Sequence, residues 1–219
     1  MTTHIISILG GTGHEGTGLG LRWAKAGHAI IIGSRTADKA QAAAAEINAR
    51  LNAASVSGMD NLAAAQAGEI IVLTVPYAAH ADTIESVRNA VQGKIFVDVT
   101  VPLVPPKVSR VQMPAAGSAS QEAQNLLGPA VKVITAFQNI SAEHLKNPEH
   151  PIDCDVLVCG DDKEAKAAII QLAADAHIQA WDAGPLANAV IAEGLTSVLI
   201  GLNLKYKVKS SGIKITGIR

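Results

Sequence analysis

Three glycines near the amino terminus have the spacing of a phosphate-binding turn. Gly11, Gly13 and Gly16 form the pattern G-x-G-x-x-G within "ILGGTGHEGTG". Between a strand and a helix, the first glycine allows a tight turn, the second lets the backbone approach a pyrophosphate, and the third lets helix and strand pack closely. The free N–H groups and the positive end of the helix dipole then face the phosphates. The spacing predicts a dinucleotide site, and the alternative is a glycine turn without a ligand.

The residues that follow the second apolar segment indicate which dinucleotide is bound. That segment ends in "IIIGSR", where enzymes that use NAD usually carry an acidic residue for the ribose hydroxyls. Ser34 can hydrogen-bond a 2′-phosphate, Arg35 can pair with it through its planar guanidinium, and Lys39 adds charge one helical turn later. Cations at a helix amino terminus oppose the helix dipole, so a bound anion explains them better than a solvated basic helix start. We therefore expect NADP(H).

The remaining polar residues form no recognisable catalytic or metal-ligating motif. We find no Ser-His-Asp or Cys-His arrangement, and His144 and His150 lack a metal-ligand spacing, so no metal site is predicted. His80 follows "VPYAA" and is a possible proton donor, but packing beside a helix start is the favoured interpretation. No side chain is predicted to act as a catalytic acid, base or nucleophile.

Alternating apolar runs and alanine-rich stretches predict the elements that position these residues. Strands that are continuously apolar are typical of a parallel sheet covered by helices on both faces. The sequence thus predicts an α/β fold with a doubly wound parallel Rossmann sheet. The predicted strands are 4–9, 29–34, 69–75, 94–100 and 131–137, and the predicted helices are 13–26, 36–53, 81–91 and 119–127.

A smaller second unit is predicted after residue 140. The proline-rich segment 101–120 interrupts the alternation and is expected to be a loop, since proline neither continues a helix nor donates in a central strand. We predict a dinucleotide-binding Rossmann domain at 1–140 and a small α/β carboxyl-terminal domain at 141–219. Its expected elements are strands at 154–160 and 178–183, helices at 161–174 and 185–206, and a tail strand at 213–218.

Composition and charge exclude several classes of function. Lys plus Arg number 18 against 19 Asp plus Glu, and aromatic residues make up 3% of the chain, which argues against nucleic-acid binding. No basic leader precedes the first strand, and the apolar stretch 190–204 is short for a membrane span and contains Glu193. A cytoplasmic protein without membrane contact is expected. Because helix 185–206 is more apolar than a surface helix should be, we also predict a homodimer.

Four segments together resemble one enzyme family. The segments "ILGGTGHEGTGLGLRWAKAGHAIIIGSR", "VLTVPYAAHADTI", "VCGDD" and "DAGPLANA" look like those of the NADPH-dependent reductases of coenzyme F-420, and the resemblance covers nearly the whole chain. It implies a two-domain protein in which NADP lies on the Rossmann part. The deazaflavin ring of F-420, the second substrate, would then stack against the nicotinamide across a cleft.

The resemblance also implies roles for individual residues. Gln138 departs from the family pattern, because it stands where family members carry His. The implied contacts are Thr12, Gly13, His14 and Glu15 for the pyrophosphate, Ser34, Arg35 and Lys39 for the 2′-phosphate, Thr74, Val75 and Pro76 for the ribose and nicotinamide, and Tyr77, Gln138 and Gly184 for the side of the deazaflavin.

The expected activity is direct hydride transfer between NADP(H) and coenzyme F-420. Proximity, ring orientation and exclusion of water would supply the catalysis, while the redox chemistry belongs to the bound rings. Two alternatives remain open at this stage. One is an NADPH-dependent reductase of flavin or another acceptor, and the other is a non-catalytic NADP(H)-sensing protein.

Overall fold

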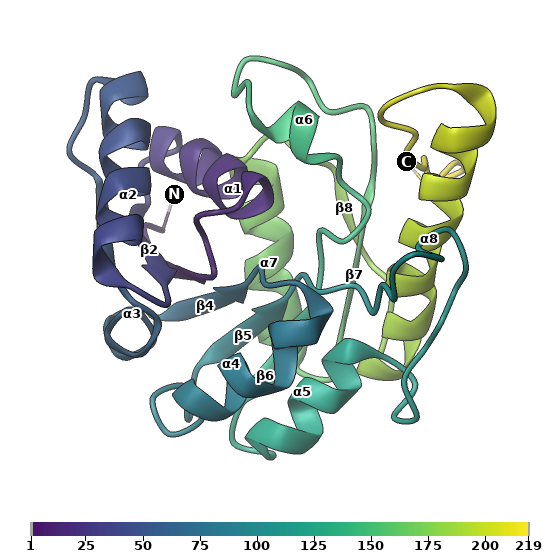
Figure 1. Ribbon diagram of the computed structural model, residues 1–219, viewed down its shortest axis with the longest axis horizontal. Helices are drawn as coiled ribbons and strands as arrows, with labels where there is room; N and C mark the ends of the chain where they lie inside the picture. Colours follow the sequence, from purple (N-terminus) through teal and green to yellow (C-terminus); the bar gives the residue numbers. More distant parts are fainter. Residues whose placement is uncertain (1, 219) are drawn as a thin grey trace.

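A single eight-stranded sheet organises the chain in the computed structural model, which describes residues 2–218 (Figure 1). The strand order is β3-β2-β1-β4-β5-β6-β7-β8. Strands β1 to β6 are parallel, β7 runs antiparallel to β6, and β8 is parallel to β7. The predicted doubly wound α/β sheet is confirmed. The strands are β1 (Ile5–Leu9), β2 (Ala29–Ser34), β3 (Val56–Asp60), β4 (Ile70–Leu73), β5 (Ile95–Asp98), β6 (Lys132–Thr135), β7 (Val156–Gly160) and β8 (Ala180–Asp182).

Helices cover both faces of the sheet and bury its apolar strands. Helices α1, α2 and α7 pack with one face, whereas α3, α4 and α5 pack with the other. Both faces of the central strands are therefore buried, which explains their continuous apolar sequences. The helices are α1 (His14–Lys25), α2 (Ala37–Leu51), α3 (Asn61–Ala67), α4 (His80–Val87), α5 (Ala119–Leu127), α6 (Ala142–Leu145), α7 (Lys163–Asp175) and α8 (Ala189–Tyr206), with short 3₁₀ turns η1 (Tyr77–Ala79) and η2 (Leu186–Asn188).

Side-chain caps fix where three of the helices begin. Asp60 accepts a hydrogen bond from Ala63 N at the start of α3, Ser118 from Gln121 N at α5, and Asp162 from Ala165 N at α7. Each cap satisfies one of the N–H groups that have no partner within the helix. The start of α1 lacks such a side-chain cap.

Two sequence predictions about strands need correction. Strand β3 was not predicted, because "VSGMD" has neither the length nor the apolar content of the other strands, and it lies at the edge of the sheet. The tail strand predicted at 213–218 is wrong, since the described residues after α8 form no strand. The tail is instead held at Asp155 by two hydrogen bonds: Asp155 N donates to Ile213 O at 2.8 Å, and Ile215 N donates to the Asp155 carboxylate at 2.9 Å.

The carboxyl-terminal part continues the sheet begun by the amino-terminal part. Strand β6 pairs with β7 through Ile134 and Gly160, and one core cluster extends from Ile6 in β1 to Ile178 before β8. In Figure 1, α8 stands at the opposite side of the molecule from α2. The division into domains at residue 140 stays a prediction.

Candidate functional site

The predicted site residues collect at one edge of the sheet, with one exception. Strands β1, β2, β4 and β6 are parallel in the sheet, so the segments that follow them emerge at the same edge. In open α/β sheets, ligands bind outside these carboxyl ends. The residues brought to this edge are Gly11, Thr12, Gly13, His14, Glu15, Gly16, Ser34, Arg35, Lys39, Thr74, Val75, Pro76, Tyr77 and Gln138.

Gly184 is the exception and corrects the sequence analysis. It follows β8, and because β7 and β8 run opposite to β6, their carboxyl ends lie at the other edge of the sheet. Gly184 O accepts from Gly160 N at 3.1 Å, and its φ of +95° is a conformation that favours glycine. Gly184 therefore serves a turn and does not lie beside the glycine loop.

The three motif glycines differ in the space around them. A Cβ on Gly16 would lie 2.6 Å from Gly11 Cα, and one on Gly11 would lie 2.5 Å from Ile8 O, so both glycines are required for close packing. A Cβ on Gly13 would meet nothing within 4 Å. Gly13 is exposed and is the N-cap of α1, whose first N–H groups have no side-chain acceptor. This open backbone fits a pyrophosphate.

The turn before the motif is held by a residue that sequence reasoning missed. Gly10 has a φ of +65°, and its N–H donates to Asn61 Oδ1 at 3.2 Å. Asn61 is the first residue of α3, in the segment where no element was predicted. The adjacent Asp60, a helix cap, was the available signal, since an acidic residue before an alanine-rich stretch is typical of a helix start.

Glu15 is a carboxyl group that burial keeps protonated. Its Oε1 is buried without a hydrogen-bond partner among the described residues, and burial raises the pKa of Glu15 to about 8. A protonated carboxyl does not repel a phosphate and can donate a hydrogen bond. The position of Glu15 in the first turn of α1 is thus compatible with the predicted pyrophosphate contact.

The end of β2 presents free basic groups. Ser34 is buried as the last residue of β2, whereas Arg35 and Lys39 are exposed around the start of α2. Neither cation takes part in an ion pair with another residue of the 2–218 range. Two exposed cations at a helix amino terminus, without acidic partners, fit a phosphate monoester.

The segment after β4 is tied both to the glycine loop and to α5. The Thr74 hydroxyl donates to Leu9 O at 3.2 Å, so this segment stays beside the end of β1. The Tyr77 hydroxyl donates to Glu122 Oε2 on α5 at 2.9 Å. Burial and this hydrogen bond raise the pKa of Tyr77 to about 12, so the phenol remains neutral. Its ring lies tilted over His80, with centroids 6.0 Å apart.

A buried imidazole–carboxylate pair lies beneath Tyr77. His80 Nε2 is 2.7 Å from Asp98 Oδ2, and the side chains are 1% and 0% exposed. Asp98 Oδ1 also accepts from Thr100 N at 2.9 Å. Burial lowers the pKa of His80, but the hydrogen bond and charge of Asp98 outweigh it, so the pKa is raised. The favoured interpretation of His80 as a packed residue at a helix start agrees with this placement.

Glu193 on α8 is a second buried carboxyl group in the same region. It is fully buried and accepts from Ala119 N at 2.7 Å, from Ser120 N at 3.0 Å and from the Ser120 hydroxyl at 2.9 Å. Burial, partly offset by these hydrogen bonds, raises its pKa to about 7. Glu193 thereby joins α8 to the amino terminus of α5. A single acid within an apolar helix was the sequence signal for such a role.

Gln138 connects three elements and faces inward. Its side-chain Nε2 donates to Asp98 O at 2.7 Å, and its backbone O accepts from the Thr196 hydroxyl at 2.9 Å. The preceding Phe137 has a φ of +74°, an unusual conformation for a bulky residue, and packs edge-on against Trp23. Gln138 is 7% exposed, so its side chain mainly holds the end of β6 against β5.

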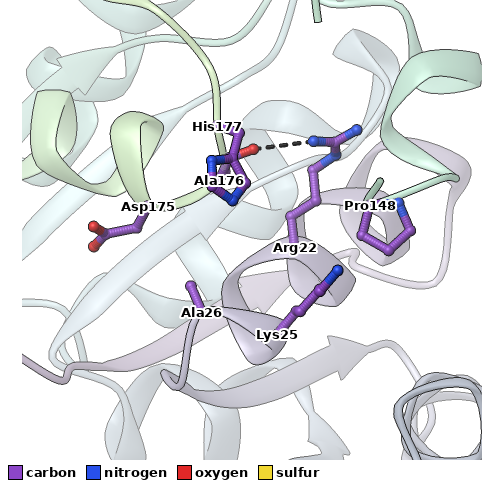
Figure 2. A pocket seen from close by; sticks show the side chains of 7 residues that line it. All are labelled: Arg22, Lys25, Ala26, Pro148, Asp175, Ala176 and His177. Carbon is purple, nitrogen blue, oxygen red and sulfur yellow. Dashed lines mark hydrogen bonds between the residues drawn. The ribbon is translucent and has the colours of Figure 1, made fainter. Parts of the chain in front are cut away.

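Two cavities lie outside the glycine loop. One, of about 450 Å³, is formed by the segment after β6 and by the tail, and its lining includes Asn139, Ser141, His144 and Ser211. The other, of about 90 Å³, lies near the carboxyl end of α1 and is shown in Figure 2. Among residues 2–218, no group of three His, Cys, Asp or Glu side chains is arranged to hold a metal ion.

The smaller cavity is lined by a structural arginine. Arg22 is 2% exposed and donates to the backbone oxygens of Ala176, His144, Asn147 and His150. Figure 2 shows its guanidinium directed at the Ala176 carbonyl, at the end of α7. Two helix carboxyl termini meet here, and their negative dipole ends favour a cation. We therefore interpret the cavity as a packing feature.

Comparison with known proteins identifies close relatives. Residues 5–102 match a family described as "NADP oxidoreductase coenzyme F420-dependent". The "F420-dependent NADP reductase" of Methanocaldococcus jannaschii is 42% identical over 221 residues, which is 97% of this chain and 98% of that protein. The protein of the same name from Methanothermobacter marburgensis is 39% identical, with 97% and 98% coverage.

Solved structures show the same fold at low sequence identity. A pyrroline-5-carboxylate reductase from Coxiella burnetii superposes with a TM-score of 0.62 at 14% identity. The superposition covers 94% of this chain and 69% of that one. At this identity the likeness concerns the fold alone.

Proposed function

This chain belongs to the family of F420-dependent NADP reductases, and on that premise we propose that it transfers a hydride between NADP(H) and coenzyme F-420. One observation from the structure carries the proposal: the edge of the sheet combines an open glycine backbone at Gly13 with the exposed cations Arg35 and Lys39, which form no ion pair within the described part of the chain. The first suits a pyrophosphate and the second a 2′-phosphate.

The protein itself would bind the two substrates, orient their rings and exclude water from them. The free N–H groups at the start of α1 hold the pyrophosphate, and Arg35 with Lys39 selects the phosphorylated ribose. Thr74 and Tyr77 would form the wall of the space for the ribose and nicotinamide. Hydrogen bonds to Leu9 O and to Glu122 hold these two side chains in place. When bound, the dihydronicotinamide ring supplies a hydride to the deazaflavin ring. Fixed orientation of this kind can account for much of a rate enhancement.

The second substrate needs space at the same edge, and the position of the larger cavity supports a role in its binding. Asn139 and Ser141 follow β6, so the 450 Å³ cavity begins where that strand leaves the sheet at the glycine-loop edge. Helix α6 packs on α1, and a Cβ on Gly18 would lie 2.5 Å from Leu145 Cβ. This cavity is our candidate for part of the F-420 site.

The proposal is tested by the spectrum of the acceptor. Purified protein is mixed with NADPH and with F-420, FMN or FAD in separate cuvettes. We expect the visible band of oxidised F-420 to bleach rapidly, and free flavins to be reduced much more slowly. Faster reduction of a flavin would support the flavin-reductase alternative. Binding of NADPH without turnover of either acceptor would support a sensor.

We further propose that the protein is a cytoplasmic homodimer that associates through α8. Ile191, Val198 and Leu202 lie on one side of this helix and are 65%, 47% and 39% exposed, an apolar face that a second copy would cover. The segment Leu186–Tyr206 passes a length and composition test for a membrane span, but 39% of it is buried and it includes Glu193. Light scattering at micromolar concentration should give twice the monomer mass; a stable monomer would contradict the dimer.

A further inference from the structure

Five ionisable side chains from five elements gather around Tyr77. His80, Asp98 and Glu193 are buried, whereas Tyr77 and Glu122 are partly exposed. Two contacts define the group: His80 with Asp98, and Tyr77 with Glu122. The five are Tyr77 (η1), His80 (α4), Asp98 (β5), Glu122 (α5) and Glu193 (α8).

These groups carry a negative net charge. Of the three carboxyl groups, only Asp98 has an ion-pair partner within residues 2–218, and this partner is His80. No Lys or Arg of the described chain forms an ion pair with Asp98, Glu122 or Glu193. Burying Asp98 and Glu193 without a Lys or Arg is costly, so packing alone does not explain why they are retained.

The location suggests which charge this group complements. Asp98 ends β5, and His80 begins the helix that follows the Thr74–Tyr77 segment. The proposed function puts the nicotinamide end of the dinucleotide beside that segment. The nicotinamide ring is positively charged in NADP⁺ and neutral in NADPH, so a nearby negative charge favours the oxidised form.

We propose that Asp98, Glu122 and Glu193, of which Asp98 alone is paired with a cationic group (His80) within residues 2–218, form a specificity-determining group that makes the site prefer NADP⁺ over NADPH. The inference rests on the proposed function, because it needs the nicotinamide at the end of β4. It assigns these residues a role in the redox state of the bound nucleotide, beyond the role of Tyr77 as a wall of the site.

Protonation of Glu193 and His80 should then change the preference for NADP⁺ over NADPH. Glu193, with a pKa of about 7, loses its proton as the pH rises through neutrality, and His80, with its raised pKa, also becomes less positive as the pH rises. Both changes make the group more negative, so the preference for NADP⁺ should grow with pH. The 2′-phosphate titrates in both forms of the nucleotide and cancels in the ratio of their affinities.

The experiment measures the dissociation constants of NADP⁺ and NADPH separately, by calorimetry, at pH 6 and pH 8. For the wild-type protein, the ratio of the NADPH constant to the NADP⁺ constant should rise about fivefold between these pH values, as expected for one unit charge acting at a distance. Glu193→Gln should flatten this rise. Asp98→Asn should lower the ratio at pH 8 by less than fivefold, because loss of Asp98 also lowers the pKa of His80 and removes part of its positive charge. The control Glu85→Gln removes an exposed carboxylate on α4 and should behave as wild type.

The measured affinities distinguish a failure of the charge effect from a failure of the proposed function. A merely structural role of Glu193 or Asp98 would weaken both nucleotides in parallel and leave the ratio unchanged. If both nucleotides bind and the ratio is insensitive to pH and to both substitutions, the inference is overturned while the proposed function stands. If the wild-type protein binds neither nucleotide, the proposed function fails and the inference fails with it.

Discussion

The two ends of helix α1 differ in whether their hydrogen-bond donors are used within the protein. At the carboxyl end, Arg22 donates to four backbone oxygens and the Trp23 indole donates to Leu172 O at 2.8 Å. At the amino end, Gly13 borders open space, and within residues 2–218 the N-cap makes no side-chain hydrogen bond and Glu15 Oε1 has no partner.

This difference distinguishes binding from support within a single helix. Polar groups in a folded protein are normally paired. The two terminal nitrogens of Arg22 donate to backbone oxygens of the chain, and its Nε alone lacks a partner among the described residues, so the chain itself explains this cluster. Free N–H groups at a helix start that also borders open space are left for a ligand. Both regions contain hydrogen-bond donors. We therefore interpret the cavity beside Arg22 as a packing feature and the open backbone at Gly13 as a ligand site.

Replacing Arg22 by Met should produce the largest loss of stability. Four backbone acceptors would lose their donor, and the expected cost is about 3–5 kcal/mol in the free energy of unfolding. Urea unfolding measures it. The control Lys25→Met removes an exposed partner of Glu149 one turn later and should cost less than about 1 kcal/mol. Equal losses in the two variants would contradict the assigned role of Arg22.

Replacing Gly13 by Val should damage binding and spare the fold. Nothing in the chain opposes the new side chain, so unfolding should change by no more than about 1 kcal/mol. The affinity for NADPH should fall roughly 30- to 100-fold, because the side chain would cover the N–H groups offered to the pyrophosphate. Calorimetric titration with NADPH measures this loss.

Gly16→Ala is the contrasting variant. Its Cβ would press on Gly11, so it should lose stability as well as affinity. Unchanged NADPH affinity in the Gly13 variant would remove the glycine loop from the site.

Replacing Arg35 by Ala should change the choice of nucleotide by a smaller factor. Loss of one charge-assisted contact should raise the Michaelis constant for NADPH about tenfold and leave that for NADH nearly unchanged. Steady-state kinetics with each nucleotide tests this. Arg88→Ala, which removes an exposed arginine paired with Glu85, serves as the control. An equal loss with NADPH and NADH would refute the contact between Arg35 and the 2′-phosphate.

Replacing Glu15 by Gln should have the smallest effect, visible in the pH dependence of stability. The folded-state pKa of about 8 lies above the ordinary value of 4.5, so the folded state holds the proton more tightly. The resulting stabilisation is complete below pH 4.5 and is lost as the pH rises through about 8.

The variant should therefore be less sensitive to pH between 5 and 8. Between these pH values, the free energy of unfolding should change by about 1 kcal/mol more in the wild type than in the variant. The effect is small because partial contact with water screens the charge. Thermal unfolding at several pH values measures it, and parallel pH profiles for the two proteins would argue against a partly buried, protonated Glu15.

The sequence predicts the parts of the fold that depend on local patterns. Apolar runs located β1, β2, β4, β5 and β6, and the glycine spacing located the turn into α1. Strand β3 was missed because an edge strand buries less and needs fewer apolar residues. The misplacement of Gly184 had another cause. The direction of β7 relative to β6 depends on the connection through α6, and a short motif such as "DAGPL" does not predict that direction.

The site was predictable where single residues act alone and not where distant residues meet. Gly13 and Arg35 are recognised from short spacings. Glu193 and Ala119 are 74 residues apart, and His80 and Asp98 are 18 apart on different elements. Their contacts form only when α5, α8 and the ends of β4 and β5 pack together, so no local sequence pattern predicts these contacts.

The most direct test of hydride transfer follows a deuterium label. NADPH carrying deuterium at the transferred position of the nicotinamide is incubated with the protein and oxidised F-420 in ordinary water. Mass spectrometry and NMR then locate the label. Direct transfer predicts deuterium on the ring carbon of the reduced deazaflavin, without loss to solvent. Reduced deazaflavin that contains only solvent hydrogen at that carbon would contradict direct transfer between the two rings.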